Sequence, residues 1–274
     1  MVSIIIPTQN SSPTLGICLR SIQSQTYPHT NIVIVDGNST DTTENIAKRY
    51  GAQVIRTHRS RSAARNIGAF AALGEYLLFL DSDMELTSDV ISNCVETTRK
   101  HCLDGVMIPE VRVGKGFWAK CRALERATYV GDPLIESARF FQKKAILSLG
   151  AFDEDLEAGE DWDLQRRLEE SHCKIGTISN CIRHHEGNLT LGHLVSKRYY
   201  YGKTIMKYVK KNSSRARSQF VPIRLNYIRN WRMLISNPQY ALGMILMRMV
   251  ENIAVMTAIL ASSTWDKRTS PPSG

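Results

Sequence analysis

Short apolar runs alternate along the chain with longer stretches in which apolar residues recur every three or four positions. Between residues 14 and 25, for example, Leu15, Cys18, Leu19 and Ile22 share one side of a helix at that spacing. The alternation predicts strand and helix units around a largely parallel sheet, which is an α/β fold. The expected strands cover residues 4–6, 32–35, 53–55, 76–80 and 105–108.

Polar and turn-forming residues directly follow three of these expected strands. The segments are Pro-Thr-Gln-Asn at 7–10, Asp-Gly-Asn-Ser-Thr-Asp at 36–41 and Asp-Ser-Asp at 81–83. In a parallel α/β sheet, the carboxyl ends of the strands meet at one edge, and ligands bind there. We therefore expect these segments to converge on a binding site.

Composition is that of an ordinary globular protein, with 43% hydrophobic and 22% charged residues among 274. This excludes a disordered chain, a collagen and a coiled-coil rod. The formal net charge of +9 is unevenly distributed, because residues 1–185 contain 21 Lys and Arg against 23 Asp and Glu, whereas residues 186–274 contain 14 against 3. We therefore expect an α/β domain over 1–185 and a basic helical extension over 186–274.

The extension contains two expected helices. Residues 193–211 place apolar residues at helical spacing among six Lys and Arg residues, which predicts a basic amphipathic helix. Residues 240–260 are apolar over about 20 positions, the length that spans a bilayer, but Arg248, Glu251 and Asn252 interrupt their middle. We expect no simple membrane span. Contact with a membrane surface, with the core or with a second subunit in a homodimer stays open for this helix.

Two further features bear on the cellular compartment. Residues 2–6 already have the pattern of a strand, so we expect no leader sequence and a cytoplasmic protein. The six cysteines include no Cys-x-x-Cys pair, which excludes a zinc ribbon and a thioredoxin motif and favours reduced thiols.

Asp81, Ser82 and Asp83 leave the expected strand 76–80 together. Two carboxylates two residues apart can share a divalent cation with a diphosphate, and hard oxygen ligands suit Mg²⁺ or Mn²⁺. Taken alone, the same three residues are a weak signal for a metal, and a turn that caps the helix near Ser88 is the favoured interpretation.

The triplet 81–83 is the last of five segments that occur in a fixed order along the chain. They are residues 3–10, 35–41, 64–68, 74–76 and 81–83, and together they resemble the family-2 glycosyltransferases. The resemblance covers roughly residues 1–185. It implies a GT-A fold, which is a Rossmann-like, mostly parallel sheet flanked by helices, together with a UDP- or GDP-sugar donor, a divalent metal (Mg²⁺ or Mn²⁺) and an inverting transfer.

The resemblance assigns residues to the donor. Asp36 would accept hydrogen bonds from the nucleotide base, with helix capping as its alternative role. Arg65 would lie beside the phosphates, with Arg59 and Arg61 assisting, and its alternative role is a surface salt bridge. The full set expected to bind the nucleotide sugar is Pro7, Thr8, Asn10, Asp36, Arg65, Asp81 and Ser82.

The segment 159–164 resembles the acceptor side of the same family. There Asp161 matches the catalytic base and Glu160 has an accessory role, although both acids could simply favour a helix N-terminus. The resemblance also implies a histidine ligand for the metal, so His185 is expected to complete the coordination that Asp83 begins. The neighbouring His184 leaves open which ring faces the metal.

Two other parts of the sequence bear on the acceptor and on the cellular location. Residues 111–141 are expected to line the acceptor site, and the basic extension suits an anionic membrane surface. We therefore expect a hydroxyl or phosphate acceptor on a lipid-linked molecule or glycan, with peripheral contact through 186–262 at the cytoplasmic membrane face. The segment 165–169 lacks the Gln-x-x-Arg-Trp pattern of processive synthases, which disfavours polymer synthesis.

Two other function classes explain the sequence less well. A nucleic-acid-binding protein would use the basic, tyrosine-rich extension, but it would leave the acidic motifs unexplained, so no nucleic-acid partner is expected. A catalytically inactive scaffold of the same fold is disfavoured because Asp83 and Asp161 are both present.

Overall fold

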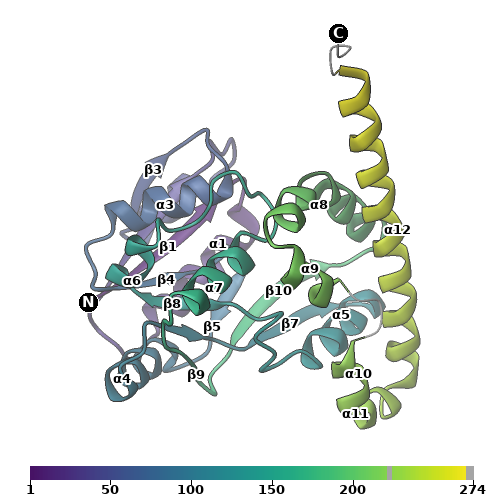
Figure 1. Cartoon of the computed structure of the whole chain (residues 1–274). Helices are drawn as coiled ribbons and strands as arrows, with labels where there is room; N and C mark the ends of the chain where they lie inside the picture. Colours follow the sequence, from purple (N-terminus) through teal and green to yellow (C-terminus); the bar gives the residue numbers. More distant parts are fainter. Residues whose placement is uncertain (221–223, 270–274) are drawn as a thin grey trace.

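A seven-stranded sheet forms the centre of the molecule in a computed structural model that describes residues 1–220 and 224–269 (Figure 1). Its order is β3-β2-β1-β4-β8-β6-β9. β1 pairs in parallel with β2 and β4, whereas β8 runs antiparallel to β4 and β6. The predicted largely parallel α/β sheet is thereby confirmed. The strands are β1 (Val2–Thr8), β2 (Thr30–Asp36), β3 (Gln53–Arg56), β4 (Tyr76–Phe79), β6 (Gly105–Met107), β8 (Ala138–Gln142) and β9 (Ile175–Thr177).

Helices cover both faces of this sheet, as the continuous apolar strands require. Because side chains alternate along a strand, Ile4 of β1 packs into one layer and Ile5 into the other. Gly68 lets α3 lie close on β1, since a Cβ there would come within 2.4 Å of the Ile5 side chain. One layer holds α1 (Ser12–Gln23), α2 (Thr43–Arg49) and α4 (Val90–His101), and the other holds α3 (Arg61–Ala71), α6 (Lys143–Ser148) and α7 (Glu160–Glu170).

A second sheet of three strands lies beside the first. Its order is β5 (Met84–Leu86), β10 (Ile182–Asn188) and β7 (Glu110–Lys115), and α5 (Phe117–Ala127) packs against β7 and β10. The acidic triplet 81–83 connects β4 of the large sheet to β5 of the small one. This connection places its side chains between the two sheets.

The C-terminal part is helical, and the predicted helices at 193–211 and 240–260 are both present within longer ones. α12 runs along one side of the molecule and packs against α8 and α5 (Figure 1). Gly202 permits this contact, because a Cβ there would come within 2.7 Å of the Ala258 side chain. The helices are α8 (Leu191–Lys211), α9 (Ser213–Gln219), α10 (Leu225–Arg229), α11 (Trp231–Ile235) and α12 (Pro238–Thr269).

The predicted boundary at residue 185 falls inside β10, and the first helix of the extension begins six residues later, at Leu191. The division into two domains therefore stays a prediction. Residues 221–223 and 270–274, which belong to the predicted extension, lie outside the described residues. The six cysteines are free thiols, and Cys18, Cys94 and Cys121 are buried.

Candidate functional site

The carboxyl ends of β1 and β2 meet as predicted, with Thr8 aligned beside Asp36. The Thr8 hydroxyl donates a hydrogen bond to Asp36 Oδ1 over 2.7 Å, and the Ser39 hydroxyl donates to the same oxygen over 2.6 Å. The Ser39 amide donates to Asp36 Oδ2 over 2.8 Å. Asp36 is only 1% exposed, so its carboxylate fixes the loop after β2. Its predicted contact with a nucleotide base stays a prediction.

Asn10 joins the loops after β1 and β2. Its φ of 48° lies in the left-handed region, which asparagine tolerates better than most residues. Its amide donates to Ser39 Oγ over 2.8 Å, and its side-chain Oδ1 accepts from the Thr40 amide over 2.9 Å. These bonds hold the edge of the sheet in one conformation before any ligand arrives.

A cavity of about 330 Å³ lies at the carboxyl ends of β1, β2 and β3. Pro7 and Thr8 line it, as predicted for donor-binding residues, together with Arg59 and Arg61. Asn38 and His58 also line it, and the Asn38 Nδ2 atom lies 2.7 Å from His58 Nδ1. No motif in the sequence points to His58, which follows the half-buried strand β3.

Arg65 of α3 connects the acidic triplet with the acidic pair. Its Nη1 donates to Glu160 Oε1 and Asp161 Oδ1, and its Nη2 donates to Asp81 Oδ1, each over 2.9 Å. The guanidinium lies over the Phe152 ring, 5.2 Å from its centre. Arg65 is 1% exposed, so three carboxylates compensate one deeply buried cation. The predicted contact of Arg65 with donor phosphates stays a prediction.

The acids that Arg65 contacts differ in pKa and in exposure. Burial opposes ionisation of Asp81, but Arg65 and Arg139 hold the pKa of Asp81 well below its usual range. Burial, and then the nearby Asp161 charge, raise the pKa of Glu160 above its usual value. The Glu160 side chain is 3% exposed and that of Asp161 is 36% exposed. Asp161 is therefore the acid of the pair that a substrate can reach.

Gly159 determines how α7 presents this pair. It precedes the helix with a φ of 81°, and a Cβ there would come within 2.7 Å of the Tyr208 ring. The Trp162 indole donates to the Ile135 carbonyl over 3.1 Å and anchors the first turn. Asp161 consequently faces a cavity of about 300 Å³, whose walls include Arg61, Arg139 and Tyr201.

The ring of His184, and not that of the predicted His185, lies beside the Asp83 carboxylate. His184 Nε2 is 3.1 Å from Asp83 Oδ2, whereas His185 Nε2 is 2.7 Å from Glu85 Oε2. Neighbouring side chains of β10 point to opposite faces, so only one ring of the doublet can face the acidic triplet. The proposed metal ligand therefore changes from His185 to His184. Ser82, between the two aspartates, donates from its hydroxyl to Ser11 Oγ over 2.9 Å.

Asp83 and His184 suit a divalent cation. A carboxylate oxygen and an imidazole nitrogen are ligands that Mn²⁺ accepts, and Mg²⁺ commonly takes one or two carboxylates and completes its shell with substrate phosphates. No group of three His, Cys, Asp or Glu side chains that could hold a metal occurs within residues 1–220 and 224–269. The remaining ligands would therefore come from the donor or from water. Glu110 lies 3.6 Å from His184 Nδ1, which is too far for a hydrogen bond.

Comparison with known proteins gives one family. The sequence model described as Glycosyl transferase family 2 matches residues 3–150. The chain is 32% identical over 149 residues to the protein named "Uncharacterized glycosyltransferase EpsJ" of Bacillus subtilis, a match that covers 52% of this chain and 40% of that protein. It is 29% identical over 177 residues to a "PGL/p-HBAD biosynthesis glycosyltransferase" of Mycobacterium bovis, covering 61% and 69%. The match thus spans less than half of the Bacillus relative.

Solved structures share the fold. The mannosyltransferase PcManGT from Pyrobaculum calidifontis, in complex with GDP-Man and Mn²⁺, has a TM-score of 0.67 at 17% identity, covering 97% of this chain and 87% of that one. TarS of S. aureus in complex with UDP-GlcNAc has a TM-score of 0.58 at 16% identity, covering 97% and 91%. The predicted GT-A architecture is confirmed by these likenesses.

Proposed function

The chain belongs to glycosyl transferase family 2, and from that premise we propose that it transfers a sugar, with inversion, from a UDP- or GDP-linked donor to a lipid-linked or glycan acceptor. The Arg65 network carries the proposal, because it joins Asp81 of the triplet to Asp161 of the acidic pair. A single site then contains groups for both the donor and the acceptor.

The donor side is supported by the cavity at the ends of β1, β2 and β3. Nucleotides bind at this edge of α/β sheets, and Pro7 and Thr8 line the cavity. Two proteins of similar fold were solved with UDP-GlcNAc and with GDP-Man. Both ligands are sugars linked to a nucleoside diphosphate, so we assign this class to the donor here.

Asp161 is the proposed base. It would take the proton from the acceptor hydroxyl while the acceptor oxygen bonds to the anomeric carbon. The bond between that carbon and the diphosphate oxygen breaks on the opposite face, and the nucleoside diphosphate leaves with the electron pair. Arg65 holds Asp161 in place, and the buried Glu160 positions Arg65 and Arg61 through ion pairs of 2.9 and 2.6 Å.

Asp83 and His184 would hold the divalent cation, Mg²⁺ or Mn²⁺. When bound, such a cation offsets the negative charge on a departing diphosphate. Arg139 approaches the same region, with its guanidinium 3.8 Å from Asp81 and 2.6 Å from Glu110. It keeps Asp81 ionised next to the metal ligands.

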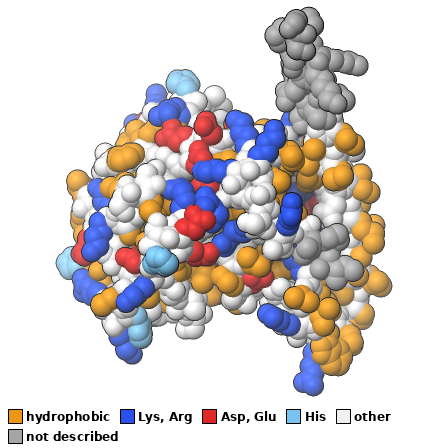
Figure 2. All heavy atoms as spheres, in the orientation of Figure 1, with side chains coloured by type: hydrophobic (Ala, Val, Ile, Leu, Met, Phe, Trp, Pro, Cys, Tyr) orange, Lys and Arg blue, Asp and Glu red, His pale blue; other side chains and the backbone are white. Residues whose placement is uncertain are grey.

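The extension is proposed to contact a membrane. By length and composition alone, residues 238–261 of α12 could cross one. The helix has two faces, because Glu251 and the Arg248 side chain turn toward α5 and α8, whereas Leu242, Ile253 and Met256 are exposed. Hydrophobic side chains line its outer edge at the right of Figure 2. A helix with this exposed row suits the surface of a bilayer, with the protein on the cytoplasmic face.

Sedimentation with vesicles tests this contact. The full chain is expected to bind vesicles rich in anionic lipid, and Ile253→Glu is expected to weaken binding, with the exposed polar position Ser236→Glu as a control. A concentration-dependent dimer that Ile253→Glu dissociates, without vesicle binding, would instead assign the exposed row to a homodimer.

A thermal-shift panel tests the donor class. UDP, GDP, CDP and dTDP are added with and without Mn²⁺, and a ligand at 100 times its Kd stabilises a protein by about 2.7 kcal/mol. We expect one nucleotide to raise the melting temperature in a metal-dependent manner. A shift with oligonucleotides but with no nucleotide would favour nucleic-acid binding. Metal-dependent donor hydrolysis would exclude an inactive scaffold.

A further inference from the structure

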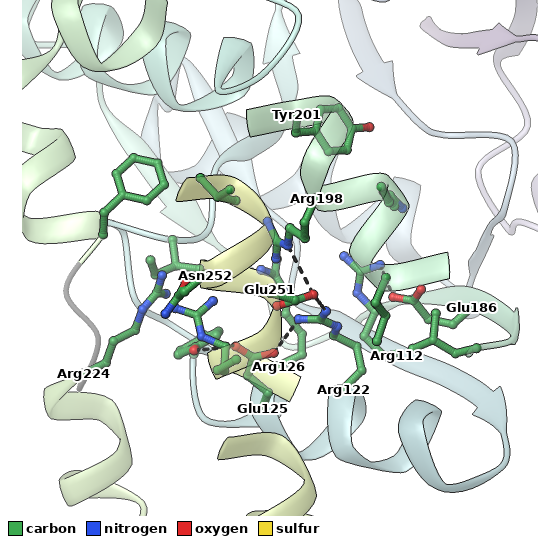
Figure 3. Close-up of a pocket in the computed structure, with 18 of the residues that line it drawn as sticks. Arg112, Arg122, Glu125, Arg126, Glu186, Arg198, Tyr201, Arg224, Glu251 and Asn252 are labelled. Atoms are coloured by element: carbon green, nitrogen blue, oxygen red, sulfur yellow. Dashed lines mark hydrogen bonds and ion pairs between the residues drawn. The ribbon is translucent and has the colours of Figure 1, made fainter. Parts of the chain in front are cut away.

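A third cavity, of about 290 Å³, lies between the small sheet and the C-terminal helices (Figure 3). Its walls come from β7, α5, α8 and α12. Seven Arg and Lys side chains line it, against three glutamates. Because these charges surround an interior space, their imbalance is felt more strongly there than on the surface.

The three glutamates are already paired. Glu125 accepts from Arg122 over 2.5 Å, and Glu186 accepts from Arg112 over 2.7 Å. Glu251 of α12 bonds Arg122 and also lies 3.2 Å from Arg198, as the dashed lines in Figure 3 show. The cavity therefore has no glutamate left for its remaining cations.

Two of those cations have no carboxylate partner among the described residues. Arg224 is 8% exposed, donates to the Gln219 carbonyl over 2.8 Å and stacks on the Tyr129 ring, and its buried Nε has no hydrogen-bond partner there. Lys197 lines the cavity from the exposed side of α8 and forms no ion pair with another described residue. Within the described part of the chain, Arg126 has one carboxylate partner, Glu110, at 3.5 Å.

An anion would complete this arrangement. A buried cation without a counterion is costly, and a ligand that brings negative charge removes the cost. Arginine binds phosphate with particular strength, because its planar guanidinium can donate two parallel hydrogen bonds to two phosphate oxygens. The remaining wall is apolar, with Leu189, Leu194 and Val255 among its residues, so it could also contact a hydrocarbon chain.

The cavity adjoins the one that Asp161 faces. Arg126, Trp162, Arg198 and Tyr201 line both, so a ligand can extend from one into the other. We infer that this cavity binds the phosphate or diphosphate group of the acceptor and thereby directs the acceptor hydroxyl toward Asp161. The inference rests on the proposed glycosyl transfer and adds the acceptor class, which is a phosphorylated carrier.

Binding of simple phosphates tests the inference without turnover. The probes are dodecyl phosphate below its micelle concentration, inorganic pyrophosphate and the uncharged dodecyl glucoside. Titrations of the full chain are run in EDTA, so that a metal at Asp83 and His184 cannot hold the probes. We expect dodecyl phosphate to bind, and dodecyl glucoside to bind at least about tenfold more weakly.

Variants then locate the site. Arg224→Gln and Lys197→Gln are each expected to weaken phosphate binding about tenfold, because each removes a cation of the cavity. Arg229→Gln, an exposed arginine on α10 outside the cavity, is the matched control and should bind like wild type. Arg224 is packed in the interior and its variant could fail to fold, whereas Lys197 is exposed, so its variant keeps the test valid.

The outcomes separate the sources of phosphate and the two proposals. In one outcome, pyrophosphate binds as tightly as dodecyl phosphate and loses the same affinity in Lys197→Gln. That result supports phosphate binding in the cavity and indicates a soluble phosphorylated acceptor. Unchanged binding in Lys197→Gln, or equal binding of the glucoside, overturns the inference. Metal-dependent nucleotide binding is measured on the same samples, and its absence in wild type would count against the donor proposal and not against the cavity.

Discussion

The sheet edge and the arginine-lined cavity handle charge in opposite ways. At the edge, the acids are compensated within the protein, with Asp36 held by Thr8 and Ser39 and three carboxylates sharing Arg65. In the cavity, cations exceed acids, and Arg224 keeps a buried nitrogen without a partner in the described chain. The acids of the first region are compensated by side chains of the protein, although Arg65 Nε and His184 Nδ1 there also lack a hydrogen-bond partner among the described residues. The cavity instead has an excess of cations that an anion would balance. We therefore assign the arginine-lined cavity to the phosphate group of the acceptor and the sheet edge to the donor.

The largest expected effect comes from replacing Asp161, the proposed base at the sheet edge. Asp161→Asn should lower transfer about 10²- to 10⁴-fold, because a general base contributes that much, while donor binding is retained. Asp155→Asn, an exposed acid in the segment that precedes α7, is the control. Initial rates and donor titrations measure the two quantities separately. Transfer at the wild-type rate in Asp161→Asn would remove the assignment of the base.

The next prediction changes the charge balance of the cavity. Glu251 is buried and pairs with Arg122 and Arg198, so Glu251→Gln should lower the free energy of unfolding by about 3 kcal/mol. Met256→Gln, on the exposed side of α12, should change it by less than about 0.5 kcal/mol. Denaturant unfolding measures both. Because Glu251→Gln leaves more positive charge, it should also tighten dodecyl phosphate binding, and weaker binding would contradict the account of the cavity.

A pair of neighbouring histidines sharpens the description of the edge. His184→Ala should weaken metal-dependent nucleotide binding about tenfold, because it removes one of two expected protein ligands. His185→Ala should have a smaller effect, since that ring contacts Glu85 instead. Nucleotide titrations at fixed Mn²⁺ measure the difference. The reverse order of effects would return the metal to the ligand that the sequence suggested.

The smallest expected effect concerns Asp163 of α7, which is bonded to Lys211 at the end of α8 and to Asn212 after it. Burial opposes ionisation of Asp163, but hydrogen bonds from Lys211, Arg167 and Asn212 lower its pKa below the usual value. The folded state therefore binds fewer protons than the unfolded chain, whose aspartate has a pKa of about 3.9. This contribution to stability is present above that pH and is lost as the pH falls through the folded pKa.

Urea unfolding between pH 3 and pH 7 measures this contribution. Wild type should lose stability below about pH 4 more steeply than Asp163→Asn, whose amide does not titrate. Parallel curves for the two proteins would show that Asp163 makes no pH-dependent contribution to stability.

Local patterns predicted the features that depend on neighbouring residues. Apolar runs gave β1, β2 and β4, and the polar segments after them do meet, since parallel strands bring their ends together. The choice between His184 and His185 could not be made, because it depends on which face of β10 is turned toward Asp83 once β10 has paired with β5.

Long-range charge pairing was also beyond the sequence. Glu251 looked like an interruption of an apolar helix, yet it pairs with Arg122, which lies 129 positions earlier in the chain. Arg65 looked like a group for phosphates, but its partners are three carboxylates from two distant segments. Such pairs are set by how α5, α7 and α12 pack, and no local spacing encodes that packing.

Turnover of nucleotide sugars tests the central claim most directly. Release of UDP or GDP is followed from a panel of UDP- and GDP-sugars with Mn²⁺, with and without a membrane lipid extract, and the anomeric configuration of the product is determined. We expect donors of one nucleotide to be consumed, faster with the extract, and to give a product of inverted configuration. Release from no donor, or a product that retains the configuration of its donor, would contradict the account.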